Sequence, residues 1–228
     1  MFDVRLRVNR LEKKYILDYE QEKIEEGLIM FYGDSTFTRW SEKWGYHDME
    51  EDIRMKDGSR AVINHGFGSS TAEELLYFYD RMVKPWKPRA LVLNVFSNDC
   101  DKAYSPEEIM ALLERIMEWA RNDIPGIKFY LCEARPLKDG IEGRVIWHFQ
   151  WHNMQLEYNE LVNQYAAKHD DCKVVSYVNH PIFFNNPEYV GDYKKIRTDT
   201  FIEDVVHLSP FGYELFAKFW REELDELL

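Results

Sequence analysis

The sequence predicts a three-layer α/β/α fold, in which helices cover both faces of a parallel β-sheet. Short apolar runs have the length of buried strands, and segments with helical spacing separate and follow them. This alternation is typical of a parallel sheet that is covered on both sides. The five expected strands are Leu28–Tyr32, Ala61–Asn64, Ala90–Val95, Ile127–Cys132 and Lys173–Tyr177. We expect them to pair in the flavodoxin-like order 2-1-3-4-5.

The expected helices carry start signals. Thr71 with Glu74, and Ser105 with Glu108, have the spacing of capping boxes, and Pro106 suits a first helical position. The expected helices are Thr71–Val83, Pro106–Asn122, Met154–His169 and Pro210–Leu228.

Three segments do not fit the alternation. Residues 5–27 are charged and suit either a leading helix or an edge segment, whereas 137–153 and 178–203 suit long loops. No Gly/Ser/Pro-rich linker divides the 228 residues. We therefore expect one domain over residues 1–228, with 1–27 as an N-terminal extension.

Composition narrows the function classes. The formal net charge of −12 argues against a nucleic-acid partner, which needs a basic face. No apolar stretch approaches the roughly 18 residues that span a bilayer, and the N-terminus lacks the apolar core of a signal peptide. We expect a cytoplasmic protein without an integral membrane segment. A mature secreted form and a homo-oligomer stay open.

The polar residues that follow the strands converge on one edge of the expected sheet. Ligands of open α/β sheets bind beyond the carboxyl ends of the strands, where the strand order reverses. In the expected order that point lies between the first and third strands. Ser35 follows the first strand, Asn98 follows the third, and the glycine-bearing turn 64–70 follows the second. Asp204 and His207 precede the last helix and can close over the same edge.

Ser35, His207 and Asp204 together offer a nucleophile, a base and an orienting acid. A hydroxyl is a poor nucleophile at its free pKa, so it needs a neighbouring base, and the base needs a carboxylate to hold its ring. The chain order Ser…Asp…His is one of several that build this arrangement. Cys100 is a second candidate nucleophile, but no histidine motif pairs with it. The three cysteines are too widely spaced to suggest a disulfide framework.

Four separated blocks of the chain resemble those of the SGNH/GDSL hydrolase superfamily in order and approximate spacing. They are Gly33-Asp34-Ser35, Gly66-Phe67-Gly68-Ser69, Phe96-Ser97-Asn98-Asp99 and Asp204-Val205-Val206-His207. The resemblance implies that Ser35 attacks an ester carbonyl, that His207 transfers the proton and that Asp204 orients His207. It also implies an oxyanion hole, formed by the Ser35 N–H, an N–H of Ser69 or Gly68, and the side-chain amide of Asn98.

Two positions depart from the pattern of the superfamily. Ser69 stands where the superfamily usually has a glycine, so Gly68 remains a second candidate for the backbone donor. Phe96 also stands in place of a glycine. We expect its side chain to narrow the pocket beside Asn98.

Several further residues are candidates for substrate contact. Asp34 can equally serve to shape the turn before Ser35, and His65 can equally pack in the core at the end of a strand. An aromatic loop around Trp147 and Trp151 suits stacking on a sugar ring or an acyl chain, and equally a dimer contact or a cover for the core. The candidates for substrate contact are Asp34, His65, Phe67, Trp147 and Trp151.

We expect neither a metal nor a cofactor. His148 and His152 have the i,i+4 spacing of metal ligands, but no third ligand accompanies them.

These expectations favour a serine esterase that cleaves small acyl esters, such as acetyl esters, including those of carbohydrates. A lysophospholipase or thioesterase would use the same triad and would need a long apolar groove. An O-acyltransferase differs only in which acceptor reaches the acyl-enzyme. A non-catalytic binding module on the same fold has no need of all four functional side chains.

Overall fold

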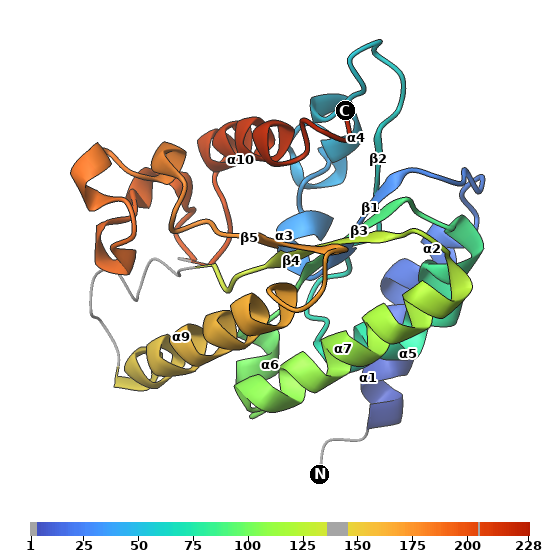
Figure 1. The fold of residues 1–228 in the computed structure, drawn as a ribbon, viewed down its shortest axis with the longest axis horizontal. Coiled ribbons are helices and arrows are strands. Elements are labelled where there is room, and N and C mark those ends of the chain that lie inside the picture. The colour runs from blue at the N-terminus through green and yellow to red at the C-terminus, as the bar shows by residue number, and fades with distance from the viewer. Residues whose placement is uncertain (1–3, 136–145, 205) are drawn as a thin grey trace.

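The computed structural model describes residues 4–135, 146–204 and 206–228, and the side chains within these ranges except those of Val4 and of residues 146–151. It contains a five-stranded, all-parallel sheet in the order β2-β1-β3-β4-β5 (Figure 1). This confirms the predicted fold class and strand order. The strands are β1 (Ile29–Gly33), β2 (Val62–Asn64), β3 (Ala90–Asn94), β4 (Lys128–Cys132) and β5 (Cys172–Val175).

Helices cover both faces of the sheet (Figure 1). One face carries α1 (Val4–Leu11), α5 (Ala72–Met82), α7 (Pro106–Asp123) and α9 (Ile146–Ala166). The opposite face carries α10 (Pro210–Glu223) and α4 (Met49–Asp52). The short helices α3 (Ser35–Thr38) and α6 (Ser97–Asp101) directly follow β1 and β3. Each face buries its own apolar core, so the sheet is covered on both sides as its strand sequences require.

The central strand β1 approaches β3 closely at its last residue. Gly33 pairs with Asn94, and a Cβ atom at Gly33 would lie 2.5 Å from the Asn94 carbonyl oxygen. Only glycine therefore fits at this position without a shift of the backbone.

The N-terminal extension is helical, which decides between the two predicted alternatives. After α1 the chain continues through a π-helical turn, Glu12–Ile16, and the short helix α2 (Leu17–Tyr19). Leu11 and Ile16 are buried in the core. Arg81 of α5 forms ion pairs with Glu12 and Glu20, which hold the segment against the domain.

The two predicted long loops have different outcomes. Helix α9 begins at Ile146, so the expectation of a loop over 137–153 is wrong for its last eight residues. That stretch contains neither Gly nor Pro, and nothing in it interrupts the helix that continues through Met154. The segment 178–203 contains no α-helix or β-strand and folds into four 3₁₀ turns. Residues 136–145 lie outside the described residues.

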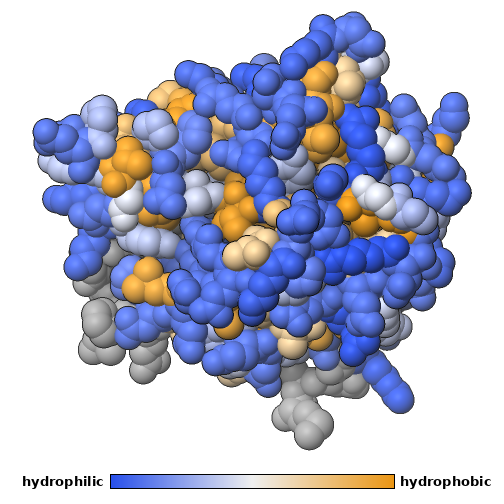
Figure 2. Space-filling view, in the orientation of Figure 1, coloured by the Kyte–Doolittle hydropathy of each residue, from blue (hydrophilic) through white to orange (hydrophobic). Residues whose placement is uncertain are grey.

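The surface is largely hydrophilic on the face shown in Figure 2, where apolar side chains form small separate patches. This agrees with the acidic composition of the chain. No helix in the described ranges combines the length and the apolar character that crossing a bilayer requires.

An aromatic cluster joins α10 to the sheet. The Trp220 ring is fully buried, and its centroid lies 4.9 Å from that of Phe31 on β1 in an edge-to-face arrangement. Phe219 and Phe37 pack around the same indole. Since α10 directly follows the segment that carries His207, this cluster anchors that segment to the sheet.

We predict that Trp220→Ala lowers the free energy of unfolding by about 3–5 kcal/mol, because it leaves a cavity beneath α10. Trp119→Ala is the matched control, since the Trp119 side chain is partly exposed on the outer face of α7. Urea unfolding of both variants measures the difference. Equal losses of stability would contradict the anchoring role of Trp220.

Candidate active site

The turn after β1 fixes the position of Ser35. Asp34 precedes the helix α3, and its buried Oδ1 accepts hydrogen bonds from the Thr36 N–H at 2.8 Å and from Asn94 Nδ2 at 3.1 Å. The Asp34 carboxylate thus stabilises the turn. This is one of the two roles, substrate contact and turn formation, that the sequence suggests for this residue. Ser35 is the first residue of α3 and lines a cavity at the carboxyl edge of the sheet.

His207 and Asp204 meet Ser35 at this edge. His207 Nε2 lies 2.9 Å from Ser35 Oγ, although 172 positions separate the two residues in the chain. His207 Nδ1 lies 2.5 Å from Asp204 Oδ2, and the His207 N–H donates to Asp204 Oδ1 at 2.9 Å. The three side chains form one hydrogen-bonded series, with the imidazole between the hydroxyl and the carboxylate.

The electrostatics favour a neutral imidazole beside an ionised carboxylate. Burial lowers the pKa of His207, the Asp204 hydrogen bond acts in the opposite direction, and the Arg39 charge lowers the pKa further. Partial burial acts to raise the pKa of Asp204, but hydrogen bonds from the backbone and ring of His207 outweigh it and leave that pKa lowered. At neutral pH the imidazole can therefore donate from Nδ1 to Asp204 and accept the Ser35 proton at Nε2.

A small cavity of about 170 Å³ opens over Ser35. Asn98 Nδ2 donates to the Ser70 carbonyl oxygen at 2.9 Å, which fixes the amide and leaves its second N–H available to a ligand. The cavity is lined by Lys14, Tyr15, Ser35, Thr38, Arg39, Trp44, Gly68, Ser69, Ser97, Asn98, Val206 and His207.

The two candidate backbone donors, Gly68 and Ser69, both line this cavity. Ser69 has φ +68°, a left-handed conformation that costs a non-glycine residue about 1–2 kcal/mol. A Cβ atom at Gly68 would lie 2.8 Å from the Tyr15 hydroxyl and 3.6 Å from Ser35 Cβ, so the close approach of Tyr15 requires glycine there. Neither N–H forms a hydrogen bond within the described part of the chain.

Phe96 does not narrow the cavity, so that expectation is wrong. Its ring is buried in the core, with its centroid 5.2 Å from that of Tyr158, and it is not part of the cavity wall. The backbone of Phe96 has φ +126°, a conformation that favours glycine.

Asp99 holds the turn after Phe96. Its two carboxylate oxygens accept hydrogen bonds from the Phe96 N–H at 3.0 Å and from the Ala72 N–H at 2.7 Å. Burial raises the pKa of Asp99 to about 7. Asp99 lies in the core rather than in the wall of the cavity.

His65 and Phe67, two of the candidates for substrate contact, lie in the core. Both side chains are fully buried, so neither reaches the cavity. His65 Nδ1 lies 2.9 Å from the Met82 carbonyl oxygen, and burial lowers the pKa of His65 to about 4. The side chains of Trp147 and Trp151 lie outside the described residues.

Two other candidate sites from the sequence, the Cys100 thiol and the His148–His152 pair, are described in part. Cys100 is nearly buried, and burial raises the pKa of its thiol to about 12, so the thiolate is scarce at neutral pH. The His152 ring packs edge-on against Tyr193, with centroids 5.4 Å apart. The side chain of His148 lies outside the described residues. Within the residues that the structure describes, no three His, Cys, Asp or Glu side chains are arranged to hold a metal ion.

Sequence reasoning missed two arginines that surround His207. Arg39 Nη1 lies 3.5 Å from Asp204 Oδ2, and its guanidinium stacks over Trp44 at 4.9 Å. Arg135 donates to the Val206 carbonyl oxygen beside His207. Neither arginine belongs to a local motif, so a single sequence holds no signal that would reveal it.

The contacts of His207 predict how its pKa responds to its neighbours. The pKa of His207 should fall in Asp204→Asn, because the lost carboxylate raised it, and should rise in Arg39→Gln, because the lost cation lowered it. An NMR titration of the His207 ring measures both changes. Arg115→Gln, an exposed substitution on α7, serves as the control and should leave the resonance unmoved. Shifts in the same direction in Asp204→Asn and Arg39→Gln would contradict this account.

Comparisons with known proteins agree with the geometry. The chain matches the model of the GDSL-like lipase/acylhydrolase family over residues 31–215. A GDSL-like lipase from Bacteroides thetaiotaomicron is 18% identical, with a TM-score of 0.66 over 97% of this chain and 98% of that one. An acetyl xylan esterase is 19% identical, with a TM-score of 0.64 over 86% and 98% of the two chains. A variant acetyl-xylooligosaccharide esterase from Geobacillus is 18% identical, with a TM-score of 0.61 over 89% and 96%.

At these identities the solved structures show a shared fold. The search among curated proteins found no match. The family model covers most of the chain and includes all four sequence blocks. The chain belongs to the GDSL-like lipase/acylhydrolase family, whose members are carboxylic ester hydrolases.

Proposed function

We propose that the protein is a serine esterase that removes small acyl groups, acetyl among them, from carbohydrate esters. The observation that carries this proposal is the hydrogen-bonded series from Ser35 through His207 to Asp204 at the mouth of a small cavity. This arrangement supports the roles of nucleophile, base and orienting acid for the three residues, and the cavity provides room for a carbonyl group over Ser35.

The mechanism proceeds through an acyl-enzyme. Ser35 Oγ attacks the ester carbonyl while His207 Nε2 takes the hydroxyl proton, and Asp204 stabilises the resulting imidazolium. The tetrahedral intermediate collapses as His207 returns this proton to the leaving alcohol. A water molecule then attacks the Ser35 ester with His207 again as the base, which releases the carboxylic acid and restores the Ser35 hydroxyl.

The oxyanion is stabilised by donors that the fold holds in place. We assign this role to the backbone N–H of Ser35, the N–H of Ser69 or Gly68, and the free N–H of Asn98. Such donors act where negative charge develops on the carbonyl oxygen, and the loss of one typically costs about 10²–10³-fold in kcat.

The size of the cavity supports a short acyl group. Its volume of about 170 Å³ is below the ~300–1,000 Å³ of typical pockets for drug-sized ligands, and Val206 is the only aliphatic side chain in its described wall. A long acyl chain, as in a lysophospholipid, needs a longer apolar channel. The structurally similar acetyl xylan esterase and acetyl-xylooligosaccharide esterase support an acetylated carbohydrate as the substrate.

Replacement of the nucleophile tests the proposal directly. Ser35→Ala should reduce the hydrolysis of p-nitrophenyl acetate to background, a loss of about 10⁴-fold or more, with little change in melting temperature. Ser59→Ala, in an exposed turn, should retain full activity and is the matched control. Turnover that persists in Ser35→Ala would remove Ser35 from the mechanism.

Asn98→Ala should lower kcat by about 10²–10³-fold and change KM little, because its bond to the oxygen strengthens mainly in the transition state. Asn185→Ala, an exposed asparagine in the 178–203 segment, is the control. Steady-state kinetics separate the two constants. A higher KM with an unchanged kcat would instead make Asn98 a residue that binds the ground state.

A further inference from the structure

A second, larger cavity adjoins the one over Ser35. Its volume is about 490 Å³, within the ~300–1,000 Å³ range of ligand-binding pockets. The two cavities share the wall residues Lys14, Tyr15, Thr38 and Trp44. A substrate whose ester lies over Ser35 can therefore extend into the larger cavity.

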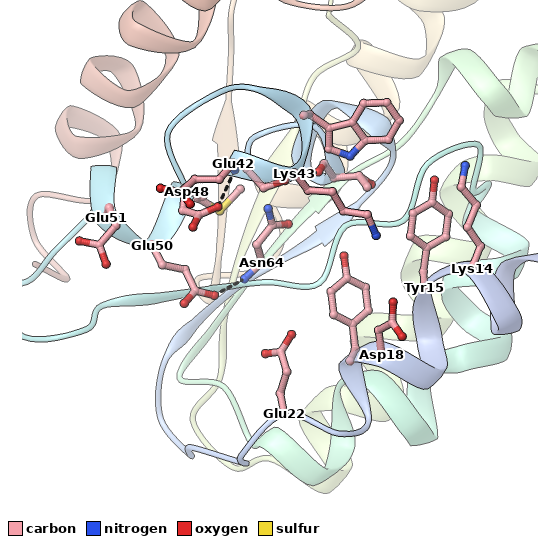
Figure 3. A pocket seen from close by; sticks show the side chains of 15 residues that line it. Lys14, Tyr15, Asp18, Glu22, Glu42, Lys43, Asp48, Glu50, Glu51 and Asn64 are labelled. Atoms are coloured by element: carbon pink, nitrogen blue, oxygen red, sulfur yellow. Dashed lines mark hydrogen bonds between the residues drawn. The ribbon is translucent and has the colours of Figure 1, made fainter.

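Two segments that are distant in sequence face each other across this cavity (Figure 3). Lys14, Tyr15, Asp18 and Glu22 come from the N-terminal segment, and the residues opposite them come from the segment 38–51 after β1. The N-terminal wall lies outside residues 31–215, which match the family model. This half of the cavity is built by residues that the family model does not include.

The charged residues that line the cavity are mostly acidic, and three aromatic rings lie among them. Met49 is the only aliphatic side chain among the fifteen lining residues, so the cavity does not suit an acyl chain. Six carboxylates and two ammonium groups line it, an excess of negative charge that disfavours a phosphate-bearing alcohol. The partly exposed side chain of Trp44 lines the cavity beneath Arg39, so its indole can contact a sugar ring.

Some of the carboxylates are already engaged, and others are available to a ligand. Glu50 pairs with Arg60 at 2.7 Å, and Glu51 pairs with Arg54. In contrast, Asp18, Glu22 and Glu42 make no side-chain hydrogen bond or ion pair with any residue in the described ranges. Carboxylates without a partner accept hydrogen bonds from hydroxyl groups, which suits a neutral ligand rich in hydroxyls. The availability of these acceptors, the acidic wall with its aromatic rings and the position beside Ser35 point to the same ligand class.

Tyr15 stands at the junction of the two cavities. Its side chain is 7% exposed, and its hydroxyl makes no hydrogen bond with the described residues. The position of a Cβ atom at Gly68 lies 2.8 Å from this hydroxyl and 3.6 Å from Ser35 Cβ, which places the phenol next to the nucleophile. Tyr15 belongs to the π-helical turn Glu12–Ile16, and such turns occur frequently at functional sites.

We propose that the larger cavity binds the polyhydroxylated alcohol of the substrate, and that Tyr15 is a positioning residue that holds the ester at the junction. This inference rests on the proposed function and extends it to the N-terminal segment. The leaving alcohol would stack on Trp44 and donate hydrogen bonds to Asp18 and Glu42.

The test compares two acetyl esters that differ in their alcohol. An acetylated xylo-oligosaccharide fills the larger cavity, whereas p-nitrophenyl acetate has no hydroxyl-rich alcohol. In Tyr15→Phe, and in the double variant Asp18→Asn/Glu42→Gln, the ratio of kcat/KM for the sugar ester to that for the aryl ester should fall about 3- to 10-fold. One or two lost hydrogen bonds account for a change of this size. The loss should appear mainly as a higher KM for the sugar ester.

Tyr77→Phe is the matched control, because Tyr77 is largely exposed on the outer face of α5. This substitution should leave the ratio unchanged. An unchanged ratio in both test variants would overturn the inference, as would faster wild-type turnover of a phosphate-bearing thioester such as acetyl-coenzyme A. Hydrolysis of neither ester by the wild type would instead contradict the proposed esterase function. Because Glu42 is exposed, Glu42→Gln alone serves as the test if the Tyr15 variant does not fold.

Discussion

The site depends on the pairing of β1 with β3 at their carboxyl ends. Gly33 lies opposite Asn94, and the buried Asp34 carboxylate binds both Asn94 Nδ2 and the Thr36 N–H. An isolated buried carboxylate would cost several kcal/mol, so these bonds make one local geometry strongly preferred. Ser35 is the next residue, and its direction follows from that geometry. Asn98 follows β3, the other strand of the pair. The pairing of the two strands therefore also sets the distance between Asn98 and Ser35.

His207 reaches this edge from the far end of the chain, and hydrogen bonds on both sides hold its segment there. The Ser209 N–H donates to the Thr200 carbonyl oxygen at 2.8 Å, and Arg135 binds the Val206 carbonyl. These contacts offset the entropy of ordering a segment without regular secondary structure. The imidazole of His207 is therefore oriented by the contacts of its backbone segment as well as by Asp204. Proton transfer requires a fixed orientation of this kind.

The sequence predicted the strands, their order and the convergence of Ser35, His207, Asp204 and Asn98, because apolar runs and strand ends are local signals. The remaining features depend on side-chain direction and on distant contacts. Phe67 lies within one of the four sequence blocks and His65 directly precedes that block, yet both side chains are buried in the core. Arg39 and Tyr15 reach the cavity through tertiary packing, which no local pattern records. The π-helical turn that carries Tyr15 likewise follows from packing against the domain.

Phe96 shows how the fold accommodates a residue in a conformation that favours glycine. Its left-handed backbone costs on the order of 1–3 kcal/mol. Burial of the ring against Tyr158 contributes about 1.5–3 kcal/mol, which is of the same size. The Asp99 carboxylate, which binds both the Phe96 and Ala72 N–H groups, then holds the strained turn to the start of α5. The strain is thus balanced within the core, and the Phe96 side chain takes no part in the wall of the cavity beside Asn98.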